Sequence, residues 1–392
     1  MNAETRIVIV GGGYTGMLAA LRLARRTRRG EIRIVLINPS DRFTERLRLH
    51  QVAAGRELAR YRIPDLLTGT GIEFVRARVV SLEARARQIR LDTGRTLRYD
   101  RLIYAVGATA DTARIPGAAE HAWTLDDPRV VHRFAARLAE CRTVAVLGAG
   151  PTGIEAATEI AANNPNTRVT LIGITEPGAM MGERARAYLR RALDRLGVTV
   201  VVDPVTEVRP DGIQLASGTT IPADLTLWTA GVRNAPLAAS AGIATDPRGA
   251  ILVDATLKSV SHPEIRAIGD AAAVTMPWGP LHGTCQSGMP TAAYAADTTA
   301  RELRGKPVRP FHFGYIHQPV SLGRRDAVIQ FTHPDDTPLR AHLTGRLAVV
   351  YKAAVSASPV PVFRLAKFLA TPVTLPRGGC AQTVLERATI EQ

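Results

Sequence analysis

The sequence predicts an α/β fold made of two Rossmann-like dinucleotide-binding domains and a C-terminal α+β region. The first observation is a glycine signature that occurs twice, at 11–16 and 148–153, each time after an apolar run and before a helix-like run. The second is that the segments after each copy follow the same order. In such loops the backbone and the helix N-terminus face a pyrophosphate. Two loops therefore predict two dinucleotides and electron transfer between them.

The first repeat begins close to the N-terminus. A strand over 6–10 enters the first glycine loop, and a helix over 16–26 carries apolar residues at helical spacing. A strand over 32–37, a hairpin between 79 and 91, and a strand ending at Ala105-Val106-Gly107 follow. This order predicts a βαβ unit with an attached hairpin and a third strand.

The second repeat spans 142–232 and has the same order. It contains a βαβ unit over 142–173, a helix over 185–196, a strand over 198–202 and a hairpin around 211–218. An apolar strand then ends at Ala230-Gly231, as the first repeat ends at Ala105-Val106-Gly107. A duplicated fold explains the order of every segment, which makes chance glycine turns the less probable explanation.

Two segments lie outside the repeats. Ile265–Ala272 reads as a strand-to-helix junction, where the Asp270 carboxylate would accept hydrogen bonds from a polyol and the following helix N-terminus would face phosphate. The alternative is that Asp270 only caps a helix. From about residue 310 the pattern changes: 311–330 is strand-rich, and 340–370 is predicted to be helical with interruptions at Pro359 and Pro361.

Composition excludes several classes of protein. The 392 residues carry a net charge of +15, but the basic residues are scattered and only 5% of residues are aromatic, so no nucleic-acid module is expected. Either anionic cofactors, an anionic membrane surface or plain solvation accounts for the charge. Three widely spaced cysteines exclude a C-x-x-C redox pair and a structural zinc site. No membrane-spanning run or signal peptide is apparent, so a cytoplasmic location is expected.

The motifs resemble the two-dinucleotide-binding-domain flavoproteins of the pyridine nucleotide-disulfide oxidoreductase superfamily, over about residues 5–300. The segments GAGPTGIEAATE at 148–159 and LWTAGV at 227–232 are similar to type II NADH dehydrogenases. The resemblance implies an FAD-binding domain split into 1–111 and 236–308, an inserted NAD(P)H-binding domain over 112–235, and an interface or membrane-facing region over 309–392.

The resemblance also implies which residues hold each cofactor. For FAD they are Gly11, Gly13, Tyr14, Thr15, Gly16, Asn38, Arg46, Val79, Val80, Ala105, Gly107, Gly269 and Asp270. For NADH or NADPH they are Gly148, Gly150, Pro151, Thr152, Gly153 and Gly231.

Three positions depart from the family pattern. Asn38 stands where an acidic residue is expected in the FAD unit, and its amide oxygen can still meet ribose hydroxyls. Gly173 holds the matching position in the second unit, so relaxed or NADPH-leaning specificity is expected. Type II dehydrogenases carry A-Q-x-A-x-Q beside the flavin; here Gln286 matches the first glutamine, whereas Pro290 replaces the second.

Three residues are candidates for catalysis. Glu155 is predicted to lie in the first turn of the second loop's helix, and the resemblance implies that it faces the nicotinamide or a proton path; a purely electrostatic role at the helix end is the alternative. His50 is a candidate proton shuttle beside the flavin, although a lone histidine is more often structural. Gln286 is a candidate for the acceptor site.

The electron acceptor stays open between a quinone and another metabolite. A slow NAD(P)H sensor resembling apoptosis-inducing factor is a further alternative, as is a flavin enzyme that has lost NAD(P)H use. In the tail, Phe363, Leu365, Phe368 and Leu369 alternate with Arg364 and Lys367. This pattern predicts either peripheral contact with the inner face of a membrane or a core or dimer-interface helix. A homodimer is expected.

Overall fold

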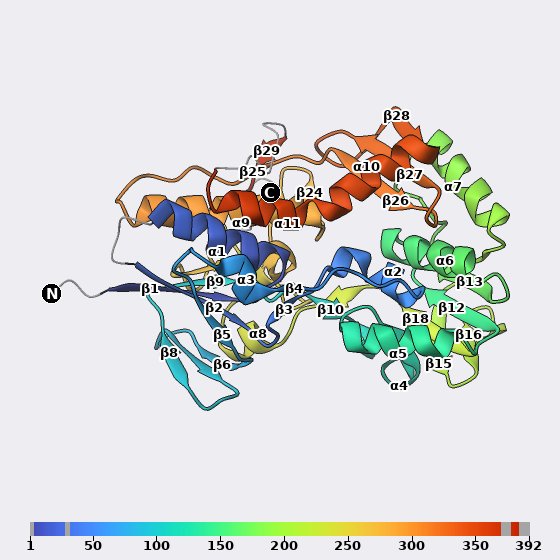
Figure 1. Cartoon of the computed structure of the whole chain (residues 1–392), viewed down its shortest axis with the longest axis horizontal. Coiled ribbons are helices and arrows are strands. Elements are labelled where there is room, and N and C mark those ends of the chain that lie inside the picture. Colours follow the sequence, from blue (N-terminus) through green and yellow to red (C-terminus); the bar gives the residue numbers. More distant parts are fainter. Residues whose placement is uncertain (1–3, 28–31, 370–377, 384–392) are drawn as a thin grey trace, which may run out of the picture.

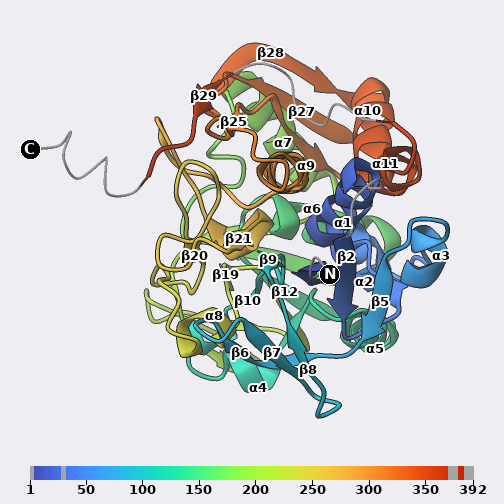
Figure 2. The ribbon, with the colours of Figure 1, turned by 90° about the vertical axis from the view of Figure 1, so that its left-hand side faces the viewer.

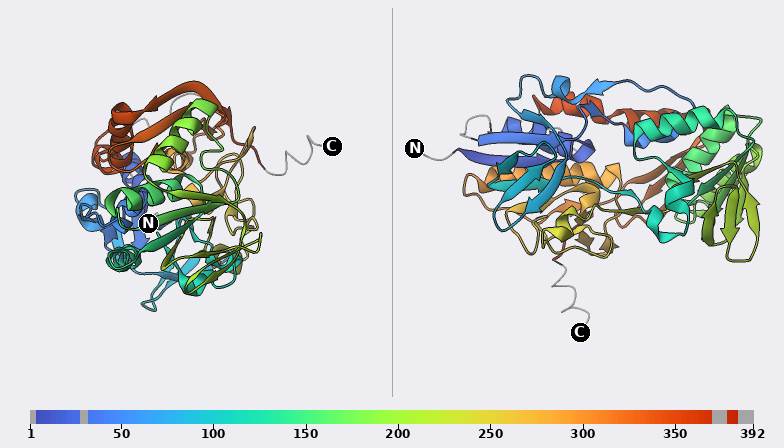
Figure 3. Two further views of the ribbon diagram at one scale, coloured as in Figure 1. Left: turned by 90° about the vertical axis from the view of Figure 1, so that its right-hand side faces the viewer. Right: turned by 90° about the horizontal axis from the view of Figure 1, so that it is seen from below.

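The computed structural model describes residues 4–27, 32–369 and 378–383. Two five-stranded parallel sheets lie side by side along the long axis of the molecule (Figure 1; Figure 3, right), and a C-terminal region spans both. The predicted α/β class with two Rossmann-like cores is confirmed.

The first sheet has the strand order β21-β9-β1-β2-β5. Its strands are β1 (Thr5–Val10), β2 (Ile32–Asn38), β5 (Glu73–Arg76), β9 (Arg101–Tyr104) and β21 (Ile265–Ala267). Helices α1 (Tyr14–Thr27) and α9 (Cys285–Glu302) cover one face, and the hairpin sheet β6 (Val79–Glu83), β7 (Gln88–Leu91) and β8 (Thr96–Arg98) lies on the other (Figure 2). Strand β21 follows the whole second unit in sequence, yet it pairs in parallel with β9.

The second sheet has the order β11-β18-β12-β13-β14. Its strands are β11 (Ala122–Thr124), β12 (Thr143–Leu147), β13 (Arg168–Gly173), β14 (Thr199–Val202) and β18 (Leu225–Trp228). Helices α5 (Pro128–Leu138), α6 (Pro151–Asn163) and α7 (Glu183–Arg195) pack around it, with the antiparallel strands β15 (Val205–Arg209), β16 (Gly212–Leu215) and β17 (Thr220–Pro222) at one end. The strands and helices of the second unit thus follow the order that the sequence predicts.

The chain passes twice between the two units, and the two connections pair. Strand β10 (Thr109–Ala110) leaves the first unit and runs antiparallel to β19 (Val232–Arg233), which returns from the second. The Asp111 carboxylate forms ion pairs with both segments, with 3.6 Å between Oδ2 and Arg114 Nε and 3.7 Å between Oδ1 and Arg233 Nε. The connection is therefore a short two-stranded ribbon.

The C-terminal region contacts both units. Strands β26 (His317–Ser321), β27 (Ala327–Thr332) and β28 (Pro338–Thr344) form an antiparallel sheet against α6 and α7, followed by α10 (Gly345–Ala357) and α11 (Pro359–Ala366). Helix α11 packs on α1 of the first unit, where Phe363 is fully buried. The prediction of helix from 340 is wrong for 340–344, which form the end of β28.

The remaining elements are short. The helical ones are α2 (Leu49–Ala53), α3 (Ile63–Leu67), α4 (Ala118–His121), α8 (Leu237–Ser240) and the 3-10 turns η1 (Arg46–Arg48), η2 (Thr112–Arg114) and η3 (Gly269–Ala271). The strands are β3 (Arg42–Phe43), β4 (Tyr61–Arg62), β20 (Ile251–Leu252), β22 (Ala272–Ala273), β23 (Thr275–Met276), β24 (Gly279–Pro280), β25 (His312–Phe313) and β29 (Gly379–Cys380). Asp270 lies in η3, which runs into β22; the expected helix directly after Asp270 is absent from this described segment.

Candidate functional site

The first glycine loop has the conformation that only glycine allows. Gly11 has φ of +106°, and a β-carbon there would overlap the carbonyl oxygen of Ala105. A β-carbon at Gly16 would overlap the carbonyl oxygen of Gly11, so the helix can approach the strand closely only with glycine. A β-carbon at Gly13 would meet no atom within 4 Å. The backbone at Gly13 is therefore open to a ligand at the start of α1.

The second loop repeats this geometry in detail. Gly148 has φ of +109°, and a β-carbon there would lie 2.7 Å from the backbone of Thr229. A β-carbon at Gly153 would overlap the carbonyl oxygen of Gly148, while Gly150 again faces open space. Pro151 and Thr152 are exposed and begin α6, which suits proline because the first helical N–H needs no partner. Both loops thus fit the phosphates of a dinucleotide.

The predicted residues around the first loop hold one another in place. Asn38 Oδ1 accepts a hydrogen bond from Gly12 N at 2.8 Å, and its amide donates to Ser40 O at 2.7 Å. Thr15 packs where Gly269 and Gly288 come together, since β-carbons at these glycines would lie 2.8 and 3.0 Å from its methyl group. Asn38 therefore binds the loop itself, a contact that the sequence did not reveal.

A second group of predicted residues lies at the C-terminal ends of β9 and β21. Arg46 donates to Ala108 O and to Asp126 Oδ1, both at 2.7 Å, and so fixes the turn at Gly107. Asp270 lines a recess of about 80 Å³, where desolvation raises the pKa of its carboxyl group. Asn234 joins these segments, because its amide donates to Gly107 O at 2.9 Å and to Asp270 O at 2.8 Å. Asn234 was not predicted; no sequence motif marks it.

The other predicted cofactor residues are placed by their strands. Tyr14 is the first residue of α1 and packs edge-to-face on Phe43, with 5.1 Å between ring centroids. Val79 and Val80 begin β6, and Val80 is 46% exposed. Gly231, with φ of +90°, forms the turn between β18 and β19. Ala105 directly follows β9 and is buried beneath Gly11.

Two of the candidate catalytic residues, Glu155 and Gln286, bind opposite ends of strand β26, and the third, His50, lies beside Glu155. Glu155 Oε1 accepts from Ser321 N at 3.0 Å at one end of the strand. Gln286 Oε1 accepts from Ile316 N at 2.9 Å at the other end, and its amide donates to His317 O at 3.0 Å. His50 reaches Glu155 from α2, with 3.7 Å between Nδ1 and Oε2. The strand was predicted only as part of a strand-rich region, so this arrangement was not foreseen.

Lys352 completes the cluster around Glu155. Its Nζ lies 2.7 Å from Glu155 Oε1 and donates to Pro319 O at 3.1 Å. Helix α6 begins at Pro151, so Glu155 lies in the second turn and not in the first. Because Glu155 is buried and paired with Lys352 and His50, its main interactions are with these groups rather than with the helix end.

Burial and charge act in opposite directions on this cluster. Burial by itself raises the pKa of Glu155, but Lys352 and His50 outweigh it and the net pKa is lowered, so the carboxylate is charged at neutral pH. Burial lowers the pKa of His50, which is therefore neutral. Among the described residues, His50 Nε2 is buried without a hydrogen-bond partner.

Gln286 has a positioning role in this structure. Its amide is engaged by the backbone of residues 316 and 317, and His317 in turn bonds the hydroxyl of Tyr351 through Nδ1 at 2.6 Å. Burial, with a smaller effect of Lys352, lowers the pKa of His317 to about 4. Pro290 lies inside α9, one turn after Gln286, and cannot donate a backbone hydrogen bond.

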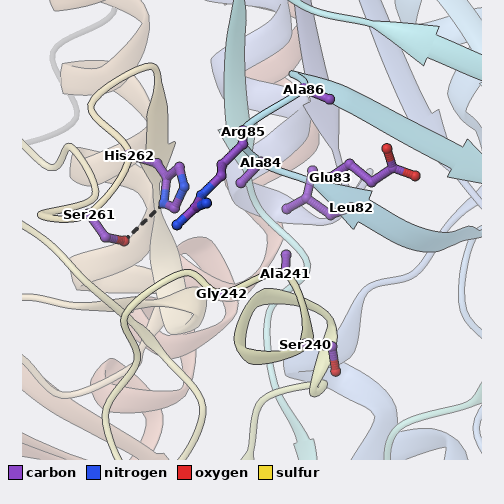
Figure 4. A pocket seen from close by; sticks show the side chains of 10 residues that line it. All are labelled: Leu82, Glu83, Ala84, Arg85, Ala86, Ser240, Ala241, Gly242, Ser261 and His262. Atoms are coloured by element: carbon purple, nitrogen blue, oxygen red, sulfur yellow. Dashed lines mark hydrogen bonds between the residues drawn. The ribbon is translucent and has the colours of Figure 1, made fainter.

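A large surface recess lies elsewhere, between the β6–β7 hairpin and α8 (Figure 4). Arg85 and His262 face each other across it, and His262 Nδ1 lies 3.1 Å from Ser261 Oγ. None of the residues predicted for either nucleotide lines this recess, so it is separate from the candidate site.

Within the described part of the chain, no group of three or more histidine, cysteine or acidic side chains is placed to bind a metal. No helix in the described ranges combines the length and apolar character needed to cross a membrane.

Two parallel sheets, each with a glycine loop whose backbone is open at the start of a helix, define a protein with two dinucleotide-binding units. The model of the pyridine nucleotide-disulphide oxidoreductase family matches residues 5–299, and the chain belongs to that family. The resemblance predicted from the motifs is thereby confirmed: the protein is an enzyme, an FAD-dependent NAD(P)H oxidoreductase.

Relatives of known sequence or structure agree with this family. The chain is 30% identical over 352 residues to an NADH dehydrogenase-like protein of Mycobacterium tuberculosis, which covers 83% of this chain and 87% of the relative. It is 27% identical over 378 residues to the demethylphylloquinone reductase of Synechocystis, covering 90% and 93%. The structure of the sulfide:quinone oxidoreductase from Aquifex aeolicus has the same fold, with a TM-score of 0.80 at 19% identity over 92% of each chain.

Proposed function

We propose that this enzyme takes a hydride from NAD(P)H at the second glycine loop and passes electrons through FAD, at the first, to a small-molecule acceptor, of which a quinone is favoured. The observation that carries the proposal is the pair of matching loops, in which Gly13 and Gly150 are both open. When bound, FAD supplies the two-electron chemistry, and the chain's own groups bind, orient and move protons.

In this proposal the FAD-binding domain consists of residues 1–111 and 236–308, and residues 112–235 bind NAD(P)H. The pairing of β21 with β9 supports the division, because it joins the later segment to the first sheet. Asp270 would meet the ribityl hydroxyls, since it lines a recess and directly follows Gly269, which packs on Thr15 in the first turn of α1. The cofactor residues predicted from the sequence belong to this proposal.

The cluster of Glu155, His50 and Lys352 is proposed to move protons during acceptor reduction. Glu155 is held as a carboxylate by Lys352, and neutral His50 offers an unpartnered Nε2. A hydroquinone forms by uptake of two electrons and two protons, so a buried acid–base cluster suits a quinone. The names of the relatives from Synechocystis and Aquifex aeolicus also favour a quinone acceptor.

Peripheral membrane contact through the C-terminal region is part of the proposal. Leu347, Val350, Phe368 and Leu369 are each more than half exposed at α10 and just beyond α11, and Arg364 and Lys367 lie among them. Apolar side chains beside cations fit an anionic lipid surface. The location would then be cytoplasmic, at the inner face of the membrane. A homodimer is retained as a proposal.

Anaerobic stopped-flow reduction of the purified FAD-loaded protein tests the proposal. NADH and NADPH are each mixed with the enzyme, flavin absorbance is followed, and quinones and other acceptors are then added. Rapid bleaching followed by reoxidation with a quinone is expected. Protein that binds no FAD would contradict the whole proposal, whereas reoxidation only by a different metabolite would contradict the quinone. Slow reduction with a persistent charge-transfer band would favour a sensor instead.

A further inference from the structure

The two glycine loops differ at one pair of facing positions. In the first unit, a β-carbon at Gly12 would lie 2.9 Å from the side chain of Asn38, so this loop position must be glycine. In the second unit the loop residue is Ala149, and a β-carbon at Gly173 would lie 2.5 Å from the methyl group of Ala149. Each pair has room for one side chain only. In the first unit the strand end carries it, as Asn38, and in the second unit the loop carries it, as Ala149.

The backbone shows that these positions are equivalent. Gly11 N donates to Ile37 O at 2.9 Å, and Gly148 N donates to Ile172 O at 2.7 Å. Asn38 and Gly173 each follow that acceptor and end the second strand of their sheet. The glycine at 173 is therefore required by Ala149, and no side chain can stand there while alanine stays in the loop.

This position decides which nicotinamide dinucleotide a Rossmann unit accepts. A carboxylate there binds the 2′-hydroxyl of NADH and repels the 2′-phosphate of NADPH, for which a nearby arginine is the usual partner. In the second unit the Ala149–Gly173 contact removes the carboxylate, and with it the repulsion. Discrimination must then depend on charges farther along the chain.

The segment after β13 supplies one ion pair. Glu176, three residues beyond Gly173, lies 3.2 Å from Arg190 of α7, and both side chains are about half exposed. Another carboxylate near Gly173 is Asp203, whose backbone N–H donates to Gly173 O; its Oδ2 accepts a hydrogen bond from Ser217 N at 3.3 Å. Arg190 is thus a cation paired with Glu176, in the segment that follows the strand end.

We propose that the second site binds NADPH at least as well as NADH, that Arg190 meets the 2′-phosphate, and that Glu176 opposes it. This inference rests on the proposed function, because it requires a dinucleotide at the second loop. A phosphate held by arginine through charge-assisted hydrogen bonds is favoured over the same nucleotide without it. Competition with Glu176 weakens, but does not remove, this preference.

The first experiment measures equilibrium binding of NADP⁺ and NAD⁺, which do not reduce flavin, to the FAD-loaded enzyme. Arg190→Gln should weaken NADP⁺ binding by roughly tenfold or more, as expected for loss of a charge-assisted hydrogen bond, and leave NAD⁺ binding unchanged. Glu176→Gln should strengthen NADP⁺ binding severalfold. Arg184→Gln, an exposed position on the same helix, is the matched control and should change neither.

The second experiment moves the side chain back to the strand end. Gly173→Asp alone should lower the melting temperature and weaken both nucleotides, because the new β-carbon meets Ala149. The double variant Ala149→Gly/Gly173→Asp should recover stability and favour NAD⁺ over NADP⁺ by roughly tenfold or more, through hydroxyl binding and phosphate repulsion.

The outcomes separate this inference from the proposed function. Binding of both nucleotides with a hundredfold preference of the wild type for NAD⁺, or an equal loss of both in Arg190→Gln, would overturn the inference and leave the proposed function standing. A double variant that stays as unstable as Gly173→Asp would overturn the steric part. Failure of NADP⁺ and NAD⁺ to bind, together with failure of NADPH and NADH to reduce the flavin, would overturn the proposed function itself.

Discussion

Glu155 of α6 and Lys352 of α10 form a buried ion pair, with 2.7 Å between Oε1 and Nζ. The pair links the C-terminal region to the second unit, where β26 packs against both α6 and α10. Because burying one charge without its partner is far more costly than burying the pair, the two side chains depend on each other.

Lys352→Met should therefore destabilise the protein by about 3–5 kcal/mol, since it leaves the Glu155 carboxylate buried without a cation, with only neutral His50 and the N–H of Ser321 beside it. The free energy of unfolding from urea titration measures this. The double variant Glu155→Gln/Lys352→Met should regain most of the loss. If the double variant is as unstable as the single one, the pair is not the source of the effect.

The same double variant separates catalysis from folding. Glu155→Gln alone would leave Lys352 without its carboxylate partner, so any effect on turnover would be mixed with a loss of stability. In Glu155→Gln/Lys352→Met, steady-state turnover with a quinone should still fall by roughly 100-fold, a typical contribution of an acid–base group. Flavin reduction by NAD(P)H, followed separately, should change much less. Turnover equal to that of the wild type would exclude a proton-transfer role.

Stability should fall as the pH drops below about 6.5. Burial lowers the pKa of His317 to about 4, so between these values the unfolded chain binds the proton and the folded chain does not. This group then contributes a slope approaching 1.4 kcal/mol per pH unit, about the free-energy value of one proton. Unfolding between pH 6.5 and 4.5 should show a shallower slope for His317→Gln. His50, whose pKa is also lowered, gives the remaining slope in the same direction.

The aromatic stack under α11 links the tail to the first glycine loop. Phe363 is fully buried and packs edge-to-face on Phe43 at 5.2 Å, and Phe43 packs in the same way on Tyr14. Phe363→Ala should cost about 3–5 kcal/mol of stability and lower FAD retention during gel filtration. Phe368→Ala, at an exposed position nearby, is the control and should change neither quantity.

Membrane contact calls for point substitutions rather than truncation. Deleting residues beyond 358 would also remove Phe363 and expose the core of the first unit. Replacing Leu347, Val350, Phe368 and Leu369 with serine leaves that core intact, because all four side chains are exposed. Sedimentation with anionic vesicles should then fall by roughly tenfold, while reduction of the flavin stays unchanged. If as much of the variant as of the wild type sediments with the vesicles, these side chains do not bind the membrane.

Local patterns predicted both nucleotide-binding units well. The strand, loop and helix around Gly11 and Gly148 follow from apolar periodicity and from the need for glycine at a close approach. Partners that lie far apart in sequence could not be predicted in this way. Nothing in the sequence near Glu155 indicates that Lys352 will neutralise it, or that Ser321 will donate to it, because those contacts depend on how the C-terminal sheet packs.

Asn38 illustrates the limit at a single residue. Its amide oxygen is predicted to meet ribose hydroxyls, and the structure adds a hydrogen bond to it from Gly12 N that the sequence did not indicate. The sequence indicates the type of side chain at the end of the strand. Its hydrogen-bond partner depends on how closely the glycine loop approaches that strand end. Asn234 shows the same limit, since its two backbone acceptors come from segments on either side of the second unit.

Strand β26 is attached at one end to α9 through Gln286 and at the other to α6 through Glu155. Five residues of extended chain measure about 17 Å and stretch very little. The strand therefore acts as a spacer of fixed length between the two nucleotide-binding units. A change in the distance between α9 and α6 would require release of one of its ends, so the separation of the two units should be conserved when nucleotides exchange.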